Sequence, residues 1–217
     1  GSGNVPYYFD LAADPVLTSV TASNNKTEGL WITAGTLPAD RTWAVTSMPY
    51  LITGDLVVPA NITLTLGPDV VVKMNPGALL SVSGTLLVQG TLDAPVILTA
   101  QKDDSVGGDS LHDGNEAAKA PTPGDWEAIY LEAGSSASVL SFLELRYAGM
   151  TGPGNQSFTD AILIRGVSSP TLRDVRIRNV ASNGVRILNG QAKLERVDVQ
   201  GSGNVPYYFD LAADPVL

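Results

Sequence analysis

Apolar and polar residues alternate along much of the chain, in short runs separated by glycine, asparagine and serine. Between Pro170 and Val180, the residues Leu172, Val175 and Ile177 fall on one face, and arginines fall mostly on the other. A strict alternation of this kind is typical of β-strands that are buried on one side. Glycine and asparagine tolerate the left-handed backbone of the turns that join such strands. Because no segment shows a convincing helical period, the sequence predicts an all-β fold.

The strand-like runs recur at a regular spacing. Related runs begin at Ala161, Gly184 and Pro206, so that nearly equal stretches of chain separate them. A further run begins at Ala128, and a glycine-rich insertion at 150–160 explains its greater distance from Ala161. Many short strands at a period of roughly 20 residues, without helices, predict a parallel β-helix (a β-solenoid), in which the coiling of the chain connects one parallel strand to the next.

A much longer repeat is also present, because the two ends of the chain have the same sequence. Residues 201–217 read GSGNVPYYFDLAADPVL, and residues 1–17 read the same without a difference. Chance cannot produce this identity, so residues 1–217 are interpreted as one module: a full period, 1–200, followed by the beginning of the next, 201–217. Two explanations remain, a tandem array of near-identical modules and an engineered chain with a duplicated end. The array is favoured because both junctions read as ordinary sequence, and repeats that stack on their neighbours form quasi-one-dimensional proteins.

The short period predicts the size of the stack. The full period holds about nine coils, and because each coil adds ~4.8 Å, the stack should extend by roughly 40 Å. An array of β-sandwiches is the alternative fold, and it would show hairpin signals such as Asn-Gly between strands. Asn183-Gly184 and Asn189-Gly190 are present, but they fit the corners of coils equally well.

Composition narrows the classes of function. The chain has no cysteine, which excludes disulfides, cysteine-bound zinc and thiol catalysis. Its one histidine, His112, excludes a multi-histidine metal site and argues against a Ser-His-Asp triad. The net charge of −9 argues against nucleic acid and anionic membrane surfaces as partners. No apolar run approaches the ~18 residues of a membrane span, so membrane insertion is not expected.

Several blocks of the sequence resemble a recurrent pattern of bacterial right-handed parallel β-helix proteins of the pectin-lyase-like type. The pattern is a tryptophan, then Tyr-x-Ile-x-Gly-Asp, then an L-T-[IL]-x-P-G-x-x-V-K coil, a GTL-x-x-x-GT coil and a GDWGGI coil. The matching positions here are Trp43, Tyr50–Asp55, Leu64–Lys73, Gly84–Thr91 and Gly124–Ile129.

The resemblance covers most of residues 29–200. The sequence departs from the pattern at Gly67-Pro68, where the family more often has Pro-Gly, and at Glu127-Ala128, where it often has Gly-Gly. The resemblance implies a right-handed parallel β-helix and an extracellular or cell-surface location in a bacterium. It implies little about function, because such modules recur in large secreted and surface proteins of many roles.

An acidic, glycine-rich loop at Gln101–Asp125 interrupts the coils. Calcium takes six to eight oxygen ligands, which clustered carboxylates on such a loop can supply. Residues 109–114 partly match the start of a calcium-binding loop, although Leu111 takes the place of the middle ligand and no glutamate stands at the twelfth position. The alternative is a solvated acidic excursion without an ion. The candidate calcium ligands are Asp103, Asp104, Asp109, Asp113 and Glu116.

Polysaccharide lyases and hydrolases of the same fold provide the enzymatic alternative. The hydrolases carry Gly-His-Gly and Arg-Ile-Lys motifs, but this chain has no Gly-His-Gly, and Arg186-Ile187 is followed by leucine. A basic row near two aspartates is better interpreted as salt bridges between adjacent coils, and no catalytic residues are assigned. That row consists of Arg173, Arg176 and Arg178 beside Asp174 and Asp198.

The sequence therefore predicts a mechanical role, as a structural repeat of an extracellular fibre, stalk or adhesin shaft. In a coiled stack only the two ends have open strand edges, and identical modules joined in frame would cover them. The expected partners are neighbouring identical repeats, end to end and laterally, and no cofactor is required beyond the candidate calcium. A polysaccharide-binding module for cell-surface glycan is the alternative, with Trp31, Trp43 and Trp126 as residues that could stack on sugars, although packing at coil corners is favoured for them.

Overall fold

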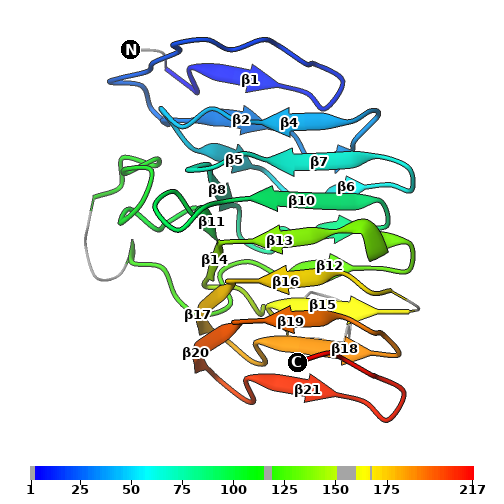
Figure 1. The fold of residues 1–217 in the computed structure, drawn as a ribbon. Coiled ribbons are helices and arrows are strands. Elements are labelled where there is room, and N and C mark those ends of the chain that lie inside the picture. Colours follow the sequence, from blue (N-terminus) through cyan, green and yellow to red (C-terminus); the bar gives the residue numbers. More distant parts are fainter. Residues whose placement is uncertain (1–2, 115–118, 151–159, 167) are drawn as a thin grey trace.

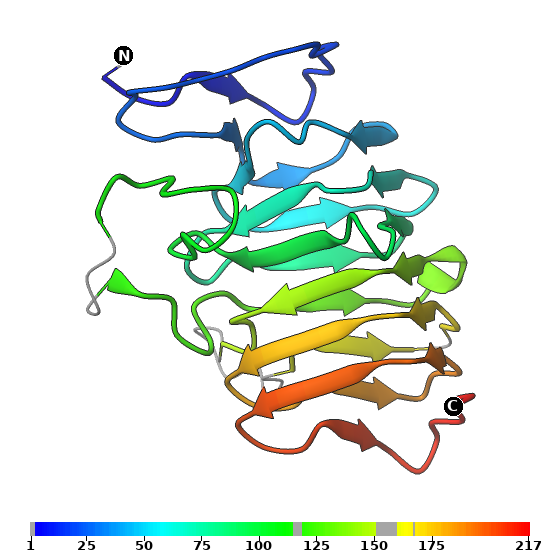
Figure 2. The same ribbon diagram turned by 60° about the vertical axis from the view of Figure 1, so that its left-hand side comes forward.

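The computed structural model describes residues 3–114, 119–150, 160–166 and 168–217, and these form a right-handed parallel β-helix. Three parallel sheets make the sides of a prism, and the coils stack along its axis from the N-terminal to the C-terminal end (Figures 1 and 2). The described residues contain no α-helix, and a 3₁₀ turn occurs at Ser135–Ala137. Accordingly, none of them belongs to a helix that is long and apolar enough to cross a membrane.

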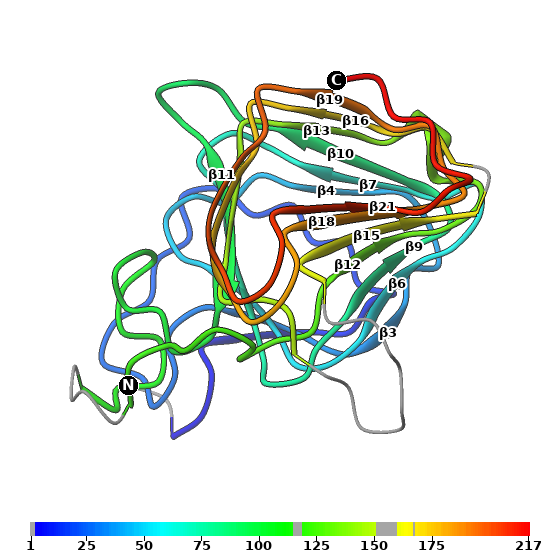
Figure 3. The ribbon, with the colours of Figure 1, turned by 90° about the horizontal axis from the view of Figure 1, so that it is seen from below.

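Each side of the prism is one sheet, and Figure 3 shows the three sides along the axis. Sheet A contains β1 (Tyr7–Phe9), β2 (Leu30–Ile32), β5 (Tyr50–Ile52), β8 (Val71–Met74), β11 (Val96–Ala100), β14 (Leu143–Arg146), β17 (Arg176–Val180) and β20 (Asp198–Ser202). Sheet B contains β3 (Gly35–Thr36), β6 (Leu56–Val58), β9 (Leu80–Val82), β12 (Ile129–Leu131), β15 (Ile162–Arg165), β18 (Val185–Leu188) and β21 (Tyr207–Phe209). Sheet C contains β4 (Arg41–Trp43), β7 (Thr63–Leu66), β10 (Thr85–Gln89), β13 (Val139–Ser141), β16 (Thr171–Arg173) and β19 (Lys193–Glu195). From β2 onward the chain visits A, B and C in strict rotation.

The short period found in the sequence is confirmed by the strand register. Leu172 pairs with Leu194, and Ile162 pairs with Val185, so each residue meets its counterpart one short period further along the chain. Alternate residues of the strands point inward, and they form one continuous core of mainly leucine, isoleucine and valine along the axis. The alternation therefore predicts correctly which side of each strand is buried.

The prediction of about nine coils is wrong. In the described part of the chain, sheet A has eight strands, which makes seven steps from β1 to β20. Two coils are longer than the rest, because Leu98 pairs with Leu145, and Leu145 in turn pairs with Ile177. The connections from Ala100 to Ile129 and from Arg146 to Ile162 are correspondingly long, so that fewer coils fit into the period. Residues 151–159 of the predicted glycine-rich insertion lie outside the described part of the chain.

The corner between sheets C and A uses residues other than glycine and asparagine. Phe142, Asp174 and Arg196 occupy equivalent corners of successive coils, with φ of 49°, 54° and 51°. Left-handed backbone is costly for such residues. The stack offsets this cost because the corners bond to one another: the Phe142 amide donates to the Arg173 carbonyl at 3.0 Å, and the Asp174 amide to the Glu195 carbonyl at 2.9 Å.

Gly84 lies where the chain turns from β9 into β10, and no larger residue fits there. A Cβ atom on Gly84 would lie 2.2 Å from the Pro59 carbonyl oxygen and 2.3 Å from the Ile62 carbonyl oxygen. Both oxygens belong to the backbone of the preceding coil, which cannot move without disturbing its own strand pairing.

Gly84→Ala should lower the free energy of unfolding by about 3 kcal/mol, because overpacking against fixed backbone is destabilising. Gly3→Ala is the matched control, since nothing lies within 4 Å of its Cβ position, and it should change stability by less than ~0.5 kcal/mol. Urea unfolding of both variants measures the difference. If the two variants unfold at the same urea concentration, the close packing around Gly84 is contradicted.

Candidate functional site

The excursion after β11 packs against the outer face of sheet A. Lys73 and Thr99 point out from β8 and β11, yet both are fully buried because the excursion covers them. The Lys73 ammonium donates to the Gly108 carbonyl, and the Glu28 amide donates to the Ser110 carbonyl at 2.9 Å. Residues 101–110 therefore form a cover on the sheet, in which Gln101, Asp103 and Ser110 are buried and Ser105, Gly107 and Gly108 are exposed to solvent.

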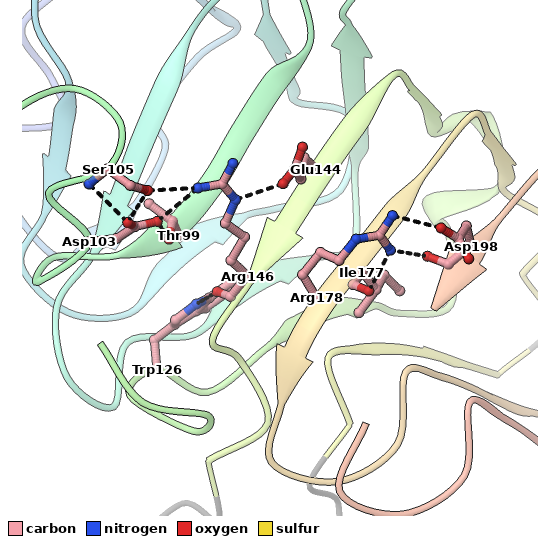
Figure 4. A network of polar contacts seen from close by, with 9 residues as sticks. All are labelled: Thr99, Asp103, Ser105, Trp126, Glu144, Arg146, Ile177, Arg178 and Asp198. Carbon is pink, nitrogen blue, oxygen red and sulfur yellow. Dashed lines mark hydrogen bonds and ion pairs between the residues drawn. The ribbon is translucent and has the colours of Figure 1, made fainter. Parts of the chain in front are cut away.

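Asp103 anchors the beginning of this cover (Figure 4). Its side chain is buried, and its oxygens accept hydrogen bonds from Thr99 Oγ1 at 2.6 Å, from Ser105 Oγ at 2.5 Å and from Arg146 Nη1 at 3.2 Å. Burial acts to raise the pKa of Asp103, but the hydrogen bonds from Ser105 and Thr99 and the charge of Arg146 together outweigh it and lower the pKa. Asp103 is thus a buried carboxylate whose oxygens are already hydrogen-bonded to other side chains of the protein.

Arg146 on β14 connects the two ends of the excursion. Its guanidinium binds Asp103 and donates from Nε to Glu144 at 2.7 Å. Its backbone carbonyl accepts a hydrogen bond at 2.7 Å from Nε1 of Trp126, the fully buried residue at which the chain returns to the coils (Figure 4). One strand residue therefore fixes both the departure and the return of the loop.

Three of the five predicted calcium ligands lie together. Asp104, Asp109 and Asp113 each offer a carboxylate oxygen, and these oxygens all lie within 4.8 Å of one another. We call these three residues the carboxylate cluster. Asp103 does not join it, because its oxygens are used in the anchor, and Glu116 lies outside the described residues.

The carboxylate cluster brings like charges close together. Burial and the neighbouring charge of Asp109 raise the pKa of Asp104. Asp109 Oδ2 accepts a hydrogen bond from the Gly114 amide at 3.2 Å, whereas its Oδ1 is buried and accepts none in the described part of the chain. Carboxylates at this distance repel one another at neutral pH, and an added cation would relieve that repulsion.

Lys73 is the residue that sequence reasoning missed. Burial lowers its pKa, and the charges of Asp104, Asp103 and Asp109 act to raise it. Its amino group lies beneath the acidic loop, where it donates to the Gly108 carbonyl. The available signal was a lone lysine within the apolar run Val70–Met74, followed later in the chain by an excess of aspartates.

The remaining candidate residues have structural positions. Trp126 and Trp43 are buried, and Trp43 stacks on Tyr50 with ring centroids 4.7 Å apart. Trp31 is partly exposed on the outer face of sheet A, beside Tyr8 of β1. The side chain of His112 is 43% exposed, and its Nε2 lies 4.0 Å from Glu28. Of the arginine row, Arg178 forms the predicted salt bridge with Asp198 at 2.6 Å, whereas Asp174 pairs at 2.6 Å with Arg196, which was not part of the predicted row.

Comparisons with known proteins do not identify the chain: no family model matches it, and no curated protein and no solved structure matches it.

Asp103→Asn should lower the free energy of unfolding by about 2 kcal/mol at pH 7, because the amide cannot accept all of the bonds that the carboxylate accepts. Folding lowers the pKa of Asp103, so its contribution is present at neutral pH and is lost as the pH falls below the ordinary carboxyl range. The difference between the wild-type chain and the variant should therefore shrink from pH 7 towards pH 3, as measured by urea unfolding.

Asp93→Asn is the matched control, because Asp93 is exposed in the turn between β10 and β11. It should leave stability within ~0.5 kcal/mol of the wild-type chain at both pH values. A deficit for Asp103→Asn that is the same at pH 3 and pH 7 would contradict the role of the charged carboxylate.

Proposed function

We propose that this chain is a structural repeat of an extracellular fibre, stalk or adhesin shaft built from tandem β-helix modules. The observation that carries the proposal is the strand pairing of the repeated segment, which uses a different strand edge at each end of the stack. Tyr7–Phe9 uses one strand edge to pair with Leu30–Ile32 of the following coil. Tyr207–Phe209, with the same sequence, uses one edge to pair with Val185–Ile187 of the preceding coil.

In the proposed array, the contacts of the two copies would combine into one complete junction between repeats. When the two strands are superposed, one edge rests on Val185–Ile187 and the other carries Leu30–Ile32, in the same parallel direction. Leu11 is buried against the coil that follows it, whereas the equivalent Leu211 is fully exposed. A following repeat would bury Leu211 and pair the open edge of Tyr207–Phe209, which removes an edge that favours aggregation.

Charge supports an exposed, soluble shaft. The whole chain carries −9, and the second copy of the repeated segment contributes Asp210 and Asp214 and no basic residue, which leaves −7 for each period. Negative charge of this size keeps long assemblies soluble and discourages contact between strand edges. The extracellular, bacterial assignment rests on the resemblance to pectin-lyase-like surface proteins.

Leu211→Asp tests the junction directly. In the single-period chain the substitution should change stability by less than ~0.5 kcal/mol, because the side chain is exposed. In a chain of two periods in series, residue 211 lies at the junction, and the same substitution should cost about 3 kcal/mol, because it places a charge where Leu11 is buried in the first copy.

Leu11→Asp is the matched control, and it should destabilise both chains. Guanidinium unfolding measures all four variants. If the two-period chain tolerates Leu211→Asp as well as the single-period chain does, or unfolds as two independent units at the single-period midpoint, the tandem shaft is wrong.

The carboxylate cluster supports calcium binding as a second function of each repeat. Its three convergent oxygens, and the buried Asp109 Oδ1 without a hydrogen bond in the described part of the chain, are the observations that favour it. Extracellular calcium sites bind with dissociation constants of about 0.1–1 mM. Calcium would also neutralise the repulsion that Lys73 offsets only in part.

Addition of about 10 mM Ca²⁺ should therefore stabilise the chain by ~1–3 kcal/mol. Asp109→Asn should abolish this gain, whereas Asp93→Asn should retain it. Thermal unfolding with and without Ca²⁺ gives the measurement. A wild-type midpoint that does not respond to Ca²⁺ would mean that Lys73 alone neutralises the cluster.

A further inference from the structure

The two copies of the repeated segment lie on different sides of the prism. Tyr7–Phe9 is the first strand of sheet A, and Tyr207–Phe209 is the last strand of sheet B (Figures 1 and 3). Their local structure is nevertheless the same: Asp10 Oδ1 accepts from the Ala12 amide at 2.9 Å, and Asp210 Oδ1 accepts from the Ala212 amide at 3.0 Å. The sequence of the segment therefore determines its local conformation, and its position along the coil determines the side of the prism on which it lies.

The cause is the number of turns in one period. Sheet A makes seven steps from β1 to β20, and the chain then passes one more corner to reach β21 in sheet B. One period therefore makes seven and one third turns, which is not a whole number. The additional third of a turn places the identical sequence of the second copy on the neighbouring side of the prism.

We propose that each repeat of the array is rotated by one third of a turn relative to the repeat before it, so that sheet B of one repeat continues as sheet A of the next. This inference rests on the tandem array of the proposed function. It identifies the partner of the open end as the first coils of a second copy, and it assigns the orientation in which that copy stacks.

The outer face of the junction carries complementary side chains. The Arg186 guanidinium lies over the Tyr208 ring, 4.5 Å from its centroid. In the first copy, the equivalent Tyr8 pairs with Trp31 of the following coil. Continuation of sheet B into sheet A therefore places one tyrosine between Arg186 of one repeat and Trp31 of the next, an arrangement that favours cation–π and aromatic contacts.

A second contact lies closer to the prism interior. Arg41 Nη2 donates to the carbonyl oxygens of Leu11 and Ala12, each at 3.2 Å, and its Nη1 lies 3.7 Å from Asp14. In the array, Arg41 of one repeat would make these contacts with the end of the repeat before it. The first copy already shows that this turn and the arginine fit together.

The other two sides follow the same rotation. After β21 the chain reaches sheet C, where Val216 forms a bridge with Lys193. In the next repeat the strand that follows β2 is β3, so sheet C continues as sheet B of that repeat. Sheet A then continues as sheet C, and every side of the prism has a continuation.

The rotation distributes the excursions around the shaft. One period advances by about 35 Å, so equivalent excursions return to the same side after roughly 105 Å. Each side of the shaft therefore presents the excursion and its carboxylate cluster once in every three repeats. A partner that binds the excursion would meet equivalent sites on all sides of the fibre.

Distances between spin labels in a chain of two periods test the rotation. The chain has no cysteine, so paired cysteine substitutions give specific labels. Gln89 on β10 of sheet C and Ser81 on β9 of sheet B both alternate with inward-facing residues on their strands. One label pair joins Gln89 of the first repeat to the Ser81 position of the second, and the other joins Gln89 to the Gln89 position of the second.

With rotation, the Gln89–Ser81 pair lies on one side of the prism, about 34 Å apart along the axis, and the Gln89–Gln89 pair spans two sides and is longer. Without rotation the order is reversed. Narrow distance distributions in the reversed order would overturn the rotation and leave the tandem shaft intact. Broad distributions for both pairs would mean that the repeats do not stack, and would overturn the shaft and the rotation together.

Discussion

Parallel hydrogen bonding between successive coils is the constraint on which the rest of this structure depends. Each coil must return to the same position after one turn, so that its strands meet the strands of the coil before it. Leu140, Leu172 and Leu194 consequently stack in one column of the core, although the first two are separated by a longer stretch of chain than the last two. Extra residues can leave the coil only between strands, and those that follow Ala100 leave it between β11 and β12.

The same constraint explains how an acidic excursion is held against the outside of the stack. The excursion buries Asp103 and Lys73, and a buried charge is tolerated only when it is paired and hydrogen-bonded. Asp103 meets Arg146 from a neighbouring strand of sheet A, and Lys73 donates to the Gly108 carbonyl within the excursion. Strand residues thus provide fixed partners for a segment that has no strand pairing of its own.

The sequence predicted the repeating parts of this molecule better than its exceptions. The alternation in Pro170–Val180 reflects the local geometry of a strand, and the short period reflects the packing of each coil on the next. The fold and the buried faces could therefore be predicted from these two patterns. The number of coils could not be derived, because the length of an excursion says nothing about where the chain rejoins the stack. Lys73 was missed for a related reason: a lone lysine on a strand indicates solvent, and only the tertiary cover reverses that interpretation.

The significance of a fractional number of turns is geometric rather than electrostatic. Charges separated by ~35 Å along a shaft are screened at physiological ionic strength, where the Debye length is about 8 Å. Repulsion between excursions of successive repeats is therefore small whether or not they lie on one side. In the proposed fibre, rotation would instead determine which surfaces are presented. A whole number of turns would give one decorated side and two plain ones, whereas seven and one third turns would give three equivalent sides. A change of one corner in the number of turns of each repeat would therefore alter the valency of the proposed fibre.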